Sequence, residues 1–153
     1  MAKQTVEVFG GIQLTIPDNF RELTEDEKKV FFASTNSRQW AVWNKEKHTM
    51  ISSEYKNVVP WDSLNRSAAN TRKFMRKKFN KYKYKEIDFT KRMNGEFPLY
   101  VIQYTYNIQE TAEHAWTVCV LRKNKLGTIS FVTREDFVEE TREEIEECVR
   151  SIH

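Results

Sequence analysis

The residues that could support catalysis or metal binding are few and lie far apart in this sequence. The 153-residue chain contains three histidines, His48, His114 and His153, and two cysteines, Cys119 and Cys148. No histidine has a second histidine, an aspartate or a cysteine at the spacing of a motif such as H-E-x-x-H, and the cysteines form no C-x-x-C pair. The sequence therefore predicts neither a metal site nor a bound cofactor.

A thiol nucleophile would need a base within hydrogen-bond reach and a third group to orient that base. Cys119 could act with His114 or His48 only if the fold brought them together, and no sequence motif does so. We expect instead that His48 and His114 lie on the surface at strand ends and that both cysteines are buried, reduced thiols. No catalytic residue is assigned, and a hydrolase built on Cys119 or a histidine ranks third among the functions considered.

The strongest charged feature is "RKFMRKKFNKYKYK", residues 72–85, which contains eight Lys or Arg and four aromatic residues. Between Arg66 and Arg92 the chain has eleven basic residues against Glu86 and Asp88, a local net charge of +9, whereas the whole chain has a net charge of +3. Like charges four residues apart on a helix destabilise it slightly. A binding partner could offset that cost.

Three interpretations of this basic segment remain open. The one we favour is that its cations are solvated or neutralised within the chain, because a helix predicted near the C-terminus carries eight acidic residues and could lie beside it. The second is an acidic protein partner. The third, a nucleic acid, is not expected, because the net charge is small and no nucleic-acid-reading motif is present. For the second, the candidate docking face consists of Arg72, Lys73, Arg76 and Lys77.

A row of tyrosines, Tyr100, Tyr104 and Tyr106, could stack on bases in a single-stranded nucleic acid. Tyrosine that alternates with isoleucine along a strand is also typical of a sheet face half-buried under a helix. We expect this second arrangement, so the tyrosines are predicted to belong to the core.

Hydrophobic periodicity predicts the elements that position these residues. Alternating apolar residues around two glycines predict a hairpin over 6–16, and the capping box of Thr24 and Glu27 begins a helix over 25–34. Two paired strands are expected over 38–46 and 48–56. A helix over 62–80 follows, with the apolar stripe Leu64, Ala68, Thr71, Met75 and Phe79.

The C-terminal half predicts four strands and a last helix. A strand runs through Tyr82 and Tyr84 with a bulge near Glu86, and Asn94-Gly95 forms a type I′ turn. Further strands cover 97–109, 115–122 and 128–133, the last two joined by the turn "NKLG". Thr133 with Asp136 caps the final helix, whose apolar stripe is Val138, Thr141, Ile145, Cys148 and Ile152.

This order of elements predicts one α+β domain over 1–153, with a central, largely antiparallel sheet flanked by helices in an α/β/α sandwich. The stretch "GIQLTIPDNFRELTEDEK" resembles the opening of the PsbP-like superfamily, whose members include the photosystem II extrinsic protein, the Mog-type Ran-binding import factor and many bacterial proteins. "KRMNGEFPLYVIQYTY", "LGTISFVT" and the closing "VRSIH" fall in the family's order, and the chain resembles members of the bacterial branch. The resemblance implies protein partners rather than a reaction, and it assigns no site residue.

We therefore expect a non-catalytic protein-interaction or adaptor domain, not an enzyme. The alternative is an anion- or nucleic-acid-binding module that uses the basic helix 62–80. No apolar run exceeds four residues, far short of the roughly 20 that a membrane-spanning helix needs. The N-terminal "MAKQTVEVFGG" is not a secretory signal, so a cytoplasmic location is expected unless a signal has been removed. The sequence does not predict the oligomeric state.

Overall fold

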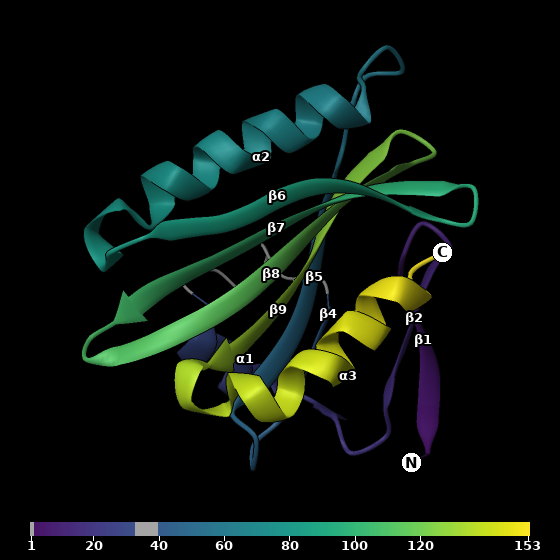
Figure 1. Ribbon diagram of the computed structural model, residues 1–153. Coiled ribbons are helices and arrows are strands. Elements are labelled where there is room, and N and C mark those ends of the chain that lie inside the picture. The colour runs from purple at the N-terminus through teal and green to yellow at the C-terminus, as the bar shows by residue number, and fades with distance from the viewer. Residues whose placement is uncertain (1, 33–39) are drawn as a thin grey trace.

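The computed structural model describes residues 2–32 and 40–153, and its centre is a seven-stranded antiparallel sheet (Figure 1). The strand order across the sheet is β3–β4–β5–β9–β8–β7–β6. The predicted α+β class with a largely antiparallel sheet is thereby confirmed. The strands of this sheet are β3 (Arg21–Glu22), β4 (Trp40–Asn44), β5 (Thr49–Asn57), β6 (Lys85–Asn94), β7 (Phe97–Ile108), β8 (Thr111–Arg122) and β9 (Lys125–Arg134).

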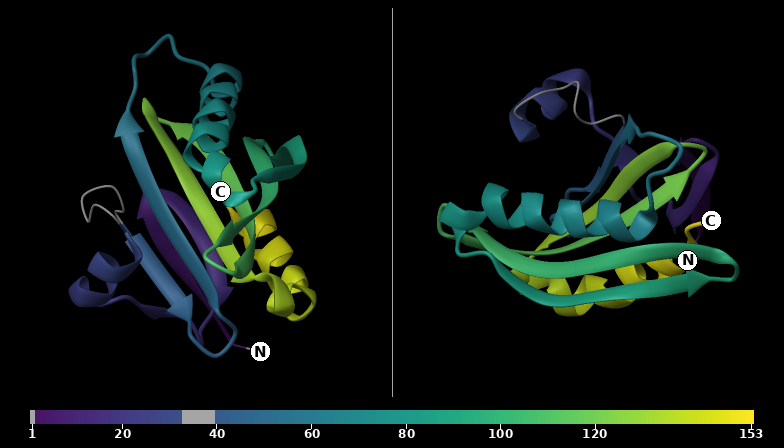
Figure 2. Two further views of the ribbon diagram at one scale, coloured as in Figure 1. Left: turned by 90° about the vertical axis from the view of Figure 1, so that its left-hand side faces the viewer. Right: turned by 90° about the horizontal axis from the view of Figure 1, so that it is seen from above.

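Different elements cover the two faces of the sheet (Figure 2). Helix α2 (Leu64–Lys78) packs on one face, against β7 and β8. Helix α3 (Val138–Ser151) lies on the opposite face, together with the separate hairpin of β1 (Lys3–Phe9) and β2 (Ile12–Pro17). The predicted sandwich is therefore confirmed, with a hairpin added to the layer of α3.

The first helix and the hairpin form where local sequence signals predict them. Gly10 and Gly11 have φ values of 55° and 81°, which a tight reversal requires and glycine adopts without strain. At α1 (Glu25–Phe31), the hydroxyl of Thr24 accepts the N–H of Glu27 at 3.2 Å, and the carboxylate of Glu27 accepts the N–H of Thr24 at 2.9 Å. Positions 33, 34, 38 and 39 of the predicted helix 25–34 and strand 38–46 lie outside the described residues.

The segment between α2 and β6 differs from the prediction. A 3₁₀ turn, η2 (Asn80–Tyr82), follows the helix, and Lys83 has a φ of 56°, so the strand begins only at Lys85. The rings of Phe79 and Tyr84 pack instead against the sheet below α2. Tyr84 therefore packs in the core below α2, Tyr82 is 41% exposed, and neither residue lies in a strand. The predicted bulge is confirmed by a shift in the β6–β7 register between Glu86 and Asp88.

Two hairpin turns also differ in detail from the prediction. The turn between β6 and β7 consists of Gly95 and Glu96, and only Gly95 has a positive φ, 63°. A type I′ turn needs two such residues, so the predicted type is wrong. Between β8 and β9 the turn consists of Lys123 and Asn124, with φ values of 52° and 61°. Most of the segment "NKLG" therefore belongs to β9.

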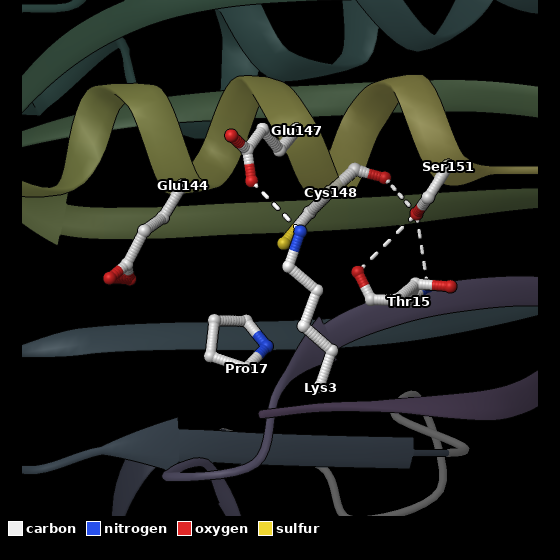
Figure 3. Close-up of a pocket in the computed structure, with 7 residues that line it drawn as sticks. All are labelled: Lys3, Thr15, Pro17, Glu144, Glu147, Cys148 and Ser151. Carbon is white, nitrogen blue, oxygen red and sulfur yellow. Dashed lines mark hydrogen bonds and ion pairs between the residues drawn. The ribbon is translucent and has the colours of Figure 1, made fainter. Parts of the chain in front are cut away.

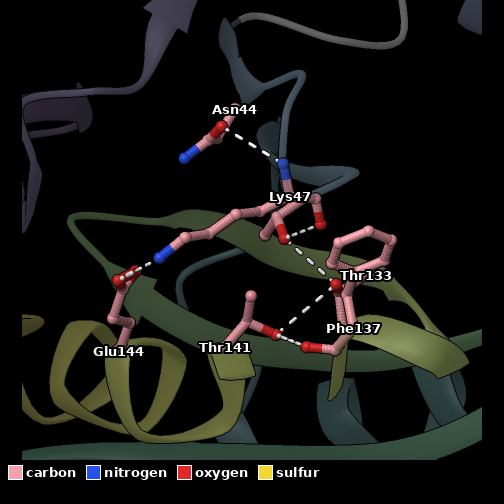
Figure 4. Close-up of polar contacts among 7 residues, drawn as sticks. Asn44, Lys47, Thr133, Phe137, Thr141 and Glu144 are labelled. Carbon is pink, nitrogen blue, oxygen red and sulfur yellow. Dashed lines mark hydrogen bonds and ion pairs between the residues drawn. The ribbon is translucent and has the colours of Figure 1, made fainter. Parts of the chain in front are cut away.

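Thr133 and Asp136 do not cap α3 as predicted. A 3₁₀ turn, η3 (Glu135–Phe137), separates β9 from α3, and no side chain caps the helix. The Oγ1 atom of Thr133 lies 3.0 Å from Oγ1 of Thr49 and 3.4 Å from Oγ1 of Thr141 (Figure 4). The hydroxyl of Thr133 therefore forms hydrogen bonds with a residue on β5 and a residue of α3, not with the N-terminal N–H groups of the helix. The predicted apolar stripe of α3 is confirmed, because its members are all buried: Val138, Thr141, Ile145, Cys148 and Ile152.

Each face of the sheet has its own core. The larger core lies below α3 and the hairpin and is centred on the fully buried Trp116 and Phe131. The smaller core lies below α2 and contains Met75, Tyr104 and Tyr106. Among the helices of the described segments, none is long and apolar enough to cross a membrane.

Candidate docking surface

Helix α2 follows the periodicity predicted for residues 62–80. Ser63 precedes the helix, and its hydroxyl accepts the N–H of Arg66 at 3.2 Å. Ala68 and Met75 are buried against the sheet. The remaining members of the predicted stripe, Leu64, Thr71 and Phe79, are partly buried. The opposite side of α2 therefore faces solvent.

This solvent side of α2 is basic and carries an exposed aromatic ring. Lys73, Arg76 and Lys77 are exposed and line an open hollow together with Asn70 and Phe74. Phe74 is 63% exposed. Within the described part of the chain, none of the three cations forms an ion pair. These five residues are called the outer face of α2 below.

Arg72, the fourth member of the predicted docking face, has a different environment. It donates from Nε and Nη2 to the two carboxylate oxygens of Glu86 on β6, and its guanidinium lies 4.6 Å from the ring centroid of Phe89. The hydrogen bond from Arg72 lowers the pKa of Glu86. The ion pair of Arg72 therefore links α2 to the sheet, and Arg72 is not part of the outer face.

One part of the interpretation that we favoured is wrong: the last helix does not lie beside the basic helix. The other part, that cations of the segment are solvated, agrees with the exposure of Lys73, Arg76 and Lys77. Helices α2 and α3 lie on opposite faces of the sheet, so their charges do not meet (Figure 2). Within the part of the chain that the structure describes, one ion pair links the segment to α3, from Arg92 of β6 to Glu146 at 2.8 Å. Other acids of α3 pair elsewhere, including Glu144 with Lys47 at 3.0 Å (Figure 4).

The tyrosine row does not form a stacking surface. Tyr104 and Tyr106 are buried under α2, where the ring of Phe79 lies 5.7 Å and 4.4 Å from their ring centroids. Tyr100 is half-buried, and its hydroxyl donates to Oδ1 of Asn65 on α2 at 2.7 Å. The prediction that these tyrosines belong to the core is confirmed.

The fold does not bring Cys119 and a histidine together. Along β8, His114 faces α3 with Trp116, whereas Cys119 faces α2 with Ala115, so the imidazole and the thiol lie on opposite faces of the sheet. Burial raises the pKa of the Cys119 thiol to about 12, which removes the thiolate that attack would need. Geometry therefore excludes a nucleophile built on Cys119 and His114, and the ring of His48 packs against Phe137.

The prediction that His114 lies on the surface is wrong. His114 is 4% exposed, and its ring nitrogens lie 2.8 Å from Nε2 of Gln103 and 3.3 Å from Oε2 of Glu135. Burial lowers the pKa of His114. Strand β8 begins at Thr111, earlier than predicted, so His114 lies inside the strand. His48 is exposed in a turn, as expected.

One carboxyl group has a strongly raised pKa. Burial raises the pKa of Glu113 on β8 to about 7, although Arg134 opposite it on β9 has the contrary effect. An acid with this pKa suits proton transfer at neutral pH. Its cross-strand neighbours are Tyr106 and Arg134, and the adjacent His114 faces the other side of the sheet. Within the described residues, no serine, cysteine or histidine stands opposite Glu113 on either neighbouring strand.

A second hollow lies between α3 and the N-terminal hairpin (Figure 3). Its volume is about 190 Å³, below the range of about 300–1,000 Å³ typical of small-molecule sites. An ion pair of Lys3 and Glu147 at 3.1 Å crosses it, and Ser151 bonds to the backbone of Thr15 on both its N–H and C=O. These contacts fasten the hairpin to α3. Within the described residues, no group of His, Cys, Asp and Glu could hold a metal ion.

We expect both cysteines to resist alkylation in the folded protein. Cys119 and Cys148 are unpaired and buried, and burial raises the pKa of each thiol to about 12. Iodoacetamide attacks the thiolate, so mass spectrometry should find no label before denaturation and two labels after it. A mass two protons lower that denaturation and alkylation leave unchanged would instead indicate a disulfide.

Comparisons with known proteins identify the fold. No family model matches the chain, and no curated protein is similar to it in sequence. Cyanobacterial PsbP (CyanoP) from Synechocystis sp. PCC 6803 is 13% identical with a TM-score of 0.69, over 94% of this chain and 86% of that chain. The Ran-binding protein Mog1p of Saccharomyces cerevisiae is 12% identical with a TM-score of 0.64, over 100% and 95% of the two chains.

A third similar structure is LpqN of Mycobacterium tuberculosis, which is involved in cell envelope biogenesis. It is 12% identical with a TM-score of 0.61, over 99% of this chain and 89% of that chain. The PsbP-like fold that the sequence resemblance implied is therefore confirmed. At these identities the likeness establishes the fold alone.

Proposed function

We propose that this protein is a non-catalytic interaction module that binds an acidic protein partner through the outer face of α2. The observation that carries the proposal is Phe74, a 63% exposed ring among the exposed cations Lys73, Arg76 and Lys77. Such a surface suits a partner segment that presents an apolar side chain flanked by carboxylates. The apolar contact would supply affinity, and the charges would supply orientation and a fast encounter.

A protein partner fits this surface better than a nucleic acid does. Binders of single-stranded nucleic acid combine a basic groove with several rings on which successive bases stack. Tyr104 and Tyr106 are buried, which leaves Phe74 as the exposed ring of the outer face. Counterion release, which drives polyanion binding, grows with the number of phosphates that basic side chains neutralise, and the outer face offers three cations for that purpose.

The structural likeness to Mog1p, a Ran-binding protein, supports a protein partner at the level of the fold. No residue of this chain takes a role from that comparison, because the identity is 12%. We also propose a cytoplasmic location, which the two unpaired thiols support, since exported proteins commonly pair their cysteines.

The test is a titration of the ¹⁵N-labelled protein with a synthetic acidic peptide that contains one central leucine. Changes in the amide chemical shifts of the protein report binding. We expect the shifts to concentrate on residues 70–77. The variant Lys73→Glu/Arg76→Glu/Lys77→Glu should bind the peptide at least about tenfold more weakly, a loss of about 1.4 kcal/mol. Phe74→Ala should weaken binding without changing its salt dependence, because it removes the apolar contact and leaves the charges.

A matched control carries the same change in net charge elsewhere. Lys29, Lys45 and Lys56 are exposed and lie outside α2, so their replacement by glutamate should leave peptide binding within about twofold of the wild type. Oligonucleotides titrated in parallel should bind weakly and lose binding near physiological salt. Oligonucleotide binding that survives at that salt and depends on Lys73, Arg76 and Lys77 would favour the anion-binding alternative.

A further inference from the structure

Strand β6 forms one edge of the seven-stranded sheet (Figure 1). In the described ranges 2–32 and 40–153 it pairs with β7 alone. It is ten residues long, whereas β3 at the opposite edge has two residues. A long edge strand presents unpaired N–H and C=O groups that can pair with another strand. The edge at β6 is therefore a place where this sheet can be extended.

The direction of these backbone groups follows from the register of the hairpin. Met93 stands opposite Pro98, which has no N–H to donate. The Met93–Pro98 pair is therefore of the non-hydrogen-bonded kind. Because pairs of the two kinds alternate along an antiparallel ladder, the N–H and C=O groups of Phe89, Lys91 and Met93 point away from β7.

The side chains of β6 restrict what can pair with it. Ile87 and Met93 are 47% and 56% exposed. Asp88 and Lys91 are also exposed and form no ion pair within the part of the chain that the structure describes. Charged side chains and a bulge are devices that protect edge strands from indiscriminate pairing. A partner strand must therefore complement this particular pattern.

We propose that the complementary strand is β6 of a second copy of this chain, paired antiparallel about a two-fold axis at Thr90. In this register Asp88 faces Arg92 of the partner subunit, and Phe89 faces Lys91 of the partner subunit. Each pair occurs twice, because a two-fold interface is built from the same surface on both copies. The strand therefore supplies both members of every pair.

The faces of the sheet agree with this register. Asp88 and Arg92 pair within their own sheet with Gln103 and Leu99, which are four residues apart on β7, so both side chains lie on one face. Arg92 uses Nη1 to donate to Glu146 at 2.8 Å, and its other N–H groups can donate to a second carboxylate. Opposite charges directly across two strands stabilise their pairing, and like charges oppose it.

The first test is sedimentation velocity over a dilution series from about 1 μM to about 1 mM. Interfaces of a single strand pair are small and belong to the weak class, so we expect a reversible monomer–dimer equilibrium. Lys91→Pro removes an N–H group that points away from β7, and an edge strand tolerates proline at such a position. This variant should abolish the dimer, while the melting temperature of the monomer should stay near that of wild type. Lys91→Ala keeps the N–H group and should still dimerise.

The second test exchanges charges and does not depend on proline. Asp88→Arg places an arginine opposite Arg92 of the partner subunit and should raise the dimer dissociation constant at least tenfold. The double variant Asp88→Arg/Arg92→Asp restores opposite charges across the axis and should recover most of that loss. Wild type that stays monomeric at the highest concentration would overturn the proposal. So would a dimer that Lys91→Pro leaves intact, or a double variant that dimerises no better than Asp88→Arg.

Discussion

Replacing Met75 with aspartate is expected to lower the free energy of unfolding by about 3–5 kcal/mol. Met75 is 5% exposed and packs in the core below α2 with Ile102 and Tyr104. Aspartate at this position would lose the apolar contacts of methionine and bury a carboxyl group away from water. Urea unfolding followed by circular dichroism at 222 nm measures the change.

Lys77→Asp is the matched control, because it places the same side chain two residues further along the same helix. Lys77 is exposed on the outer face, so we expect a loss of no more than about 1 kcal/mol, mainly from the helix dipole. Equal urea midpoints for the two variants would show that the faces of α2 are assigned wrongly. The pair also separates folding from docking, since only Lys77→Asp should yield a folded protein with a weakened outer face.

The buried stripe of α2 could be predicted because helical periodicity is a local property. Ala68 and Met75 are separated by two helical turns, and no long-range information is needed to place them on one face. The same holds for the capping box of Thr24 and Glu27, whose two hydrogen bonds join residues three apart. Local patterns such as these predict the folded structure correctly when no distant residue forms a competing contact with the same side chains.

Predictions failed where a distant residue competed with the local pattern. Thr133 carries a capping signal, but β5 places the hydroxyl of Thr49 at 3.0 Å from its own, and the helix begins later. His114 was expected at a strand end, yet Gln103 on β7 holds one ring nitrogen inside the sheet. Neither partner can be identified from the sequence near the residue itself.

The candidate docking face was predicted in part. Lys73, Arg76 and Lys77 are exposed as helical spacing indicates, but Arg72 pairs with Glu86, fourteen residues away on β6. The sequence contains both charges and gives no sign that they meet. Phe74 was not predicted as part of the docking face. The sequence does contain a signal for it, because Phe74 lies outside the apolar stripe of α2, and an aromatic residue on the polar side of an amphipathic helix is a candidate contact residue.

Gly127→Ala is expected to destabilise the protein by about 2–3 kcal/mol, although alanine normally suits a strand better than glycine. Gly127 lies in β9, and a Cβ atom there would stand 1.9 Å from Cζ of Phe9. The ring of Phe9 is 5% exposed and stacked on Tyr55 at 5.3 Å, so it has little room to withdraw. The ring of Phe9 therefore occupies the space that a side chain at position 127 would need.

A double-mutant cycle distinguishes this steric cause from a general effect on β9. Phe9→Ala alone should cost about 3–5 kcal/mol, because it empties part of the larger core. In that background Gly127→Ala should cost almost nothing or stabilise slightly, since its Cβ atom then enters vacated space. The coupling between the two changes should be about 2–3 kcal/mol, measured by urea unfolding. If the free-energy costs of the two changes are strictly additive, the ring of Phe9 does not lie over Gly127. The packing of the N-terminal hairpin on β9 described above would then be wrong.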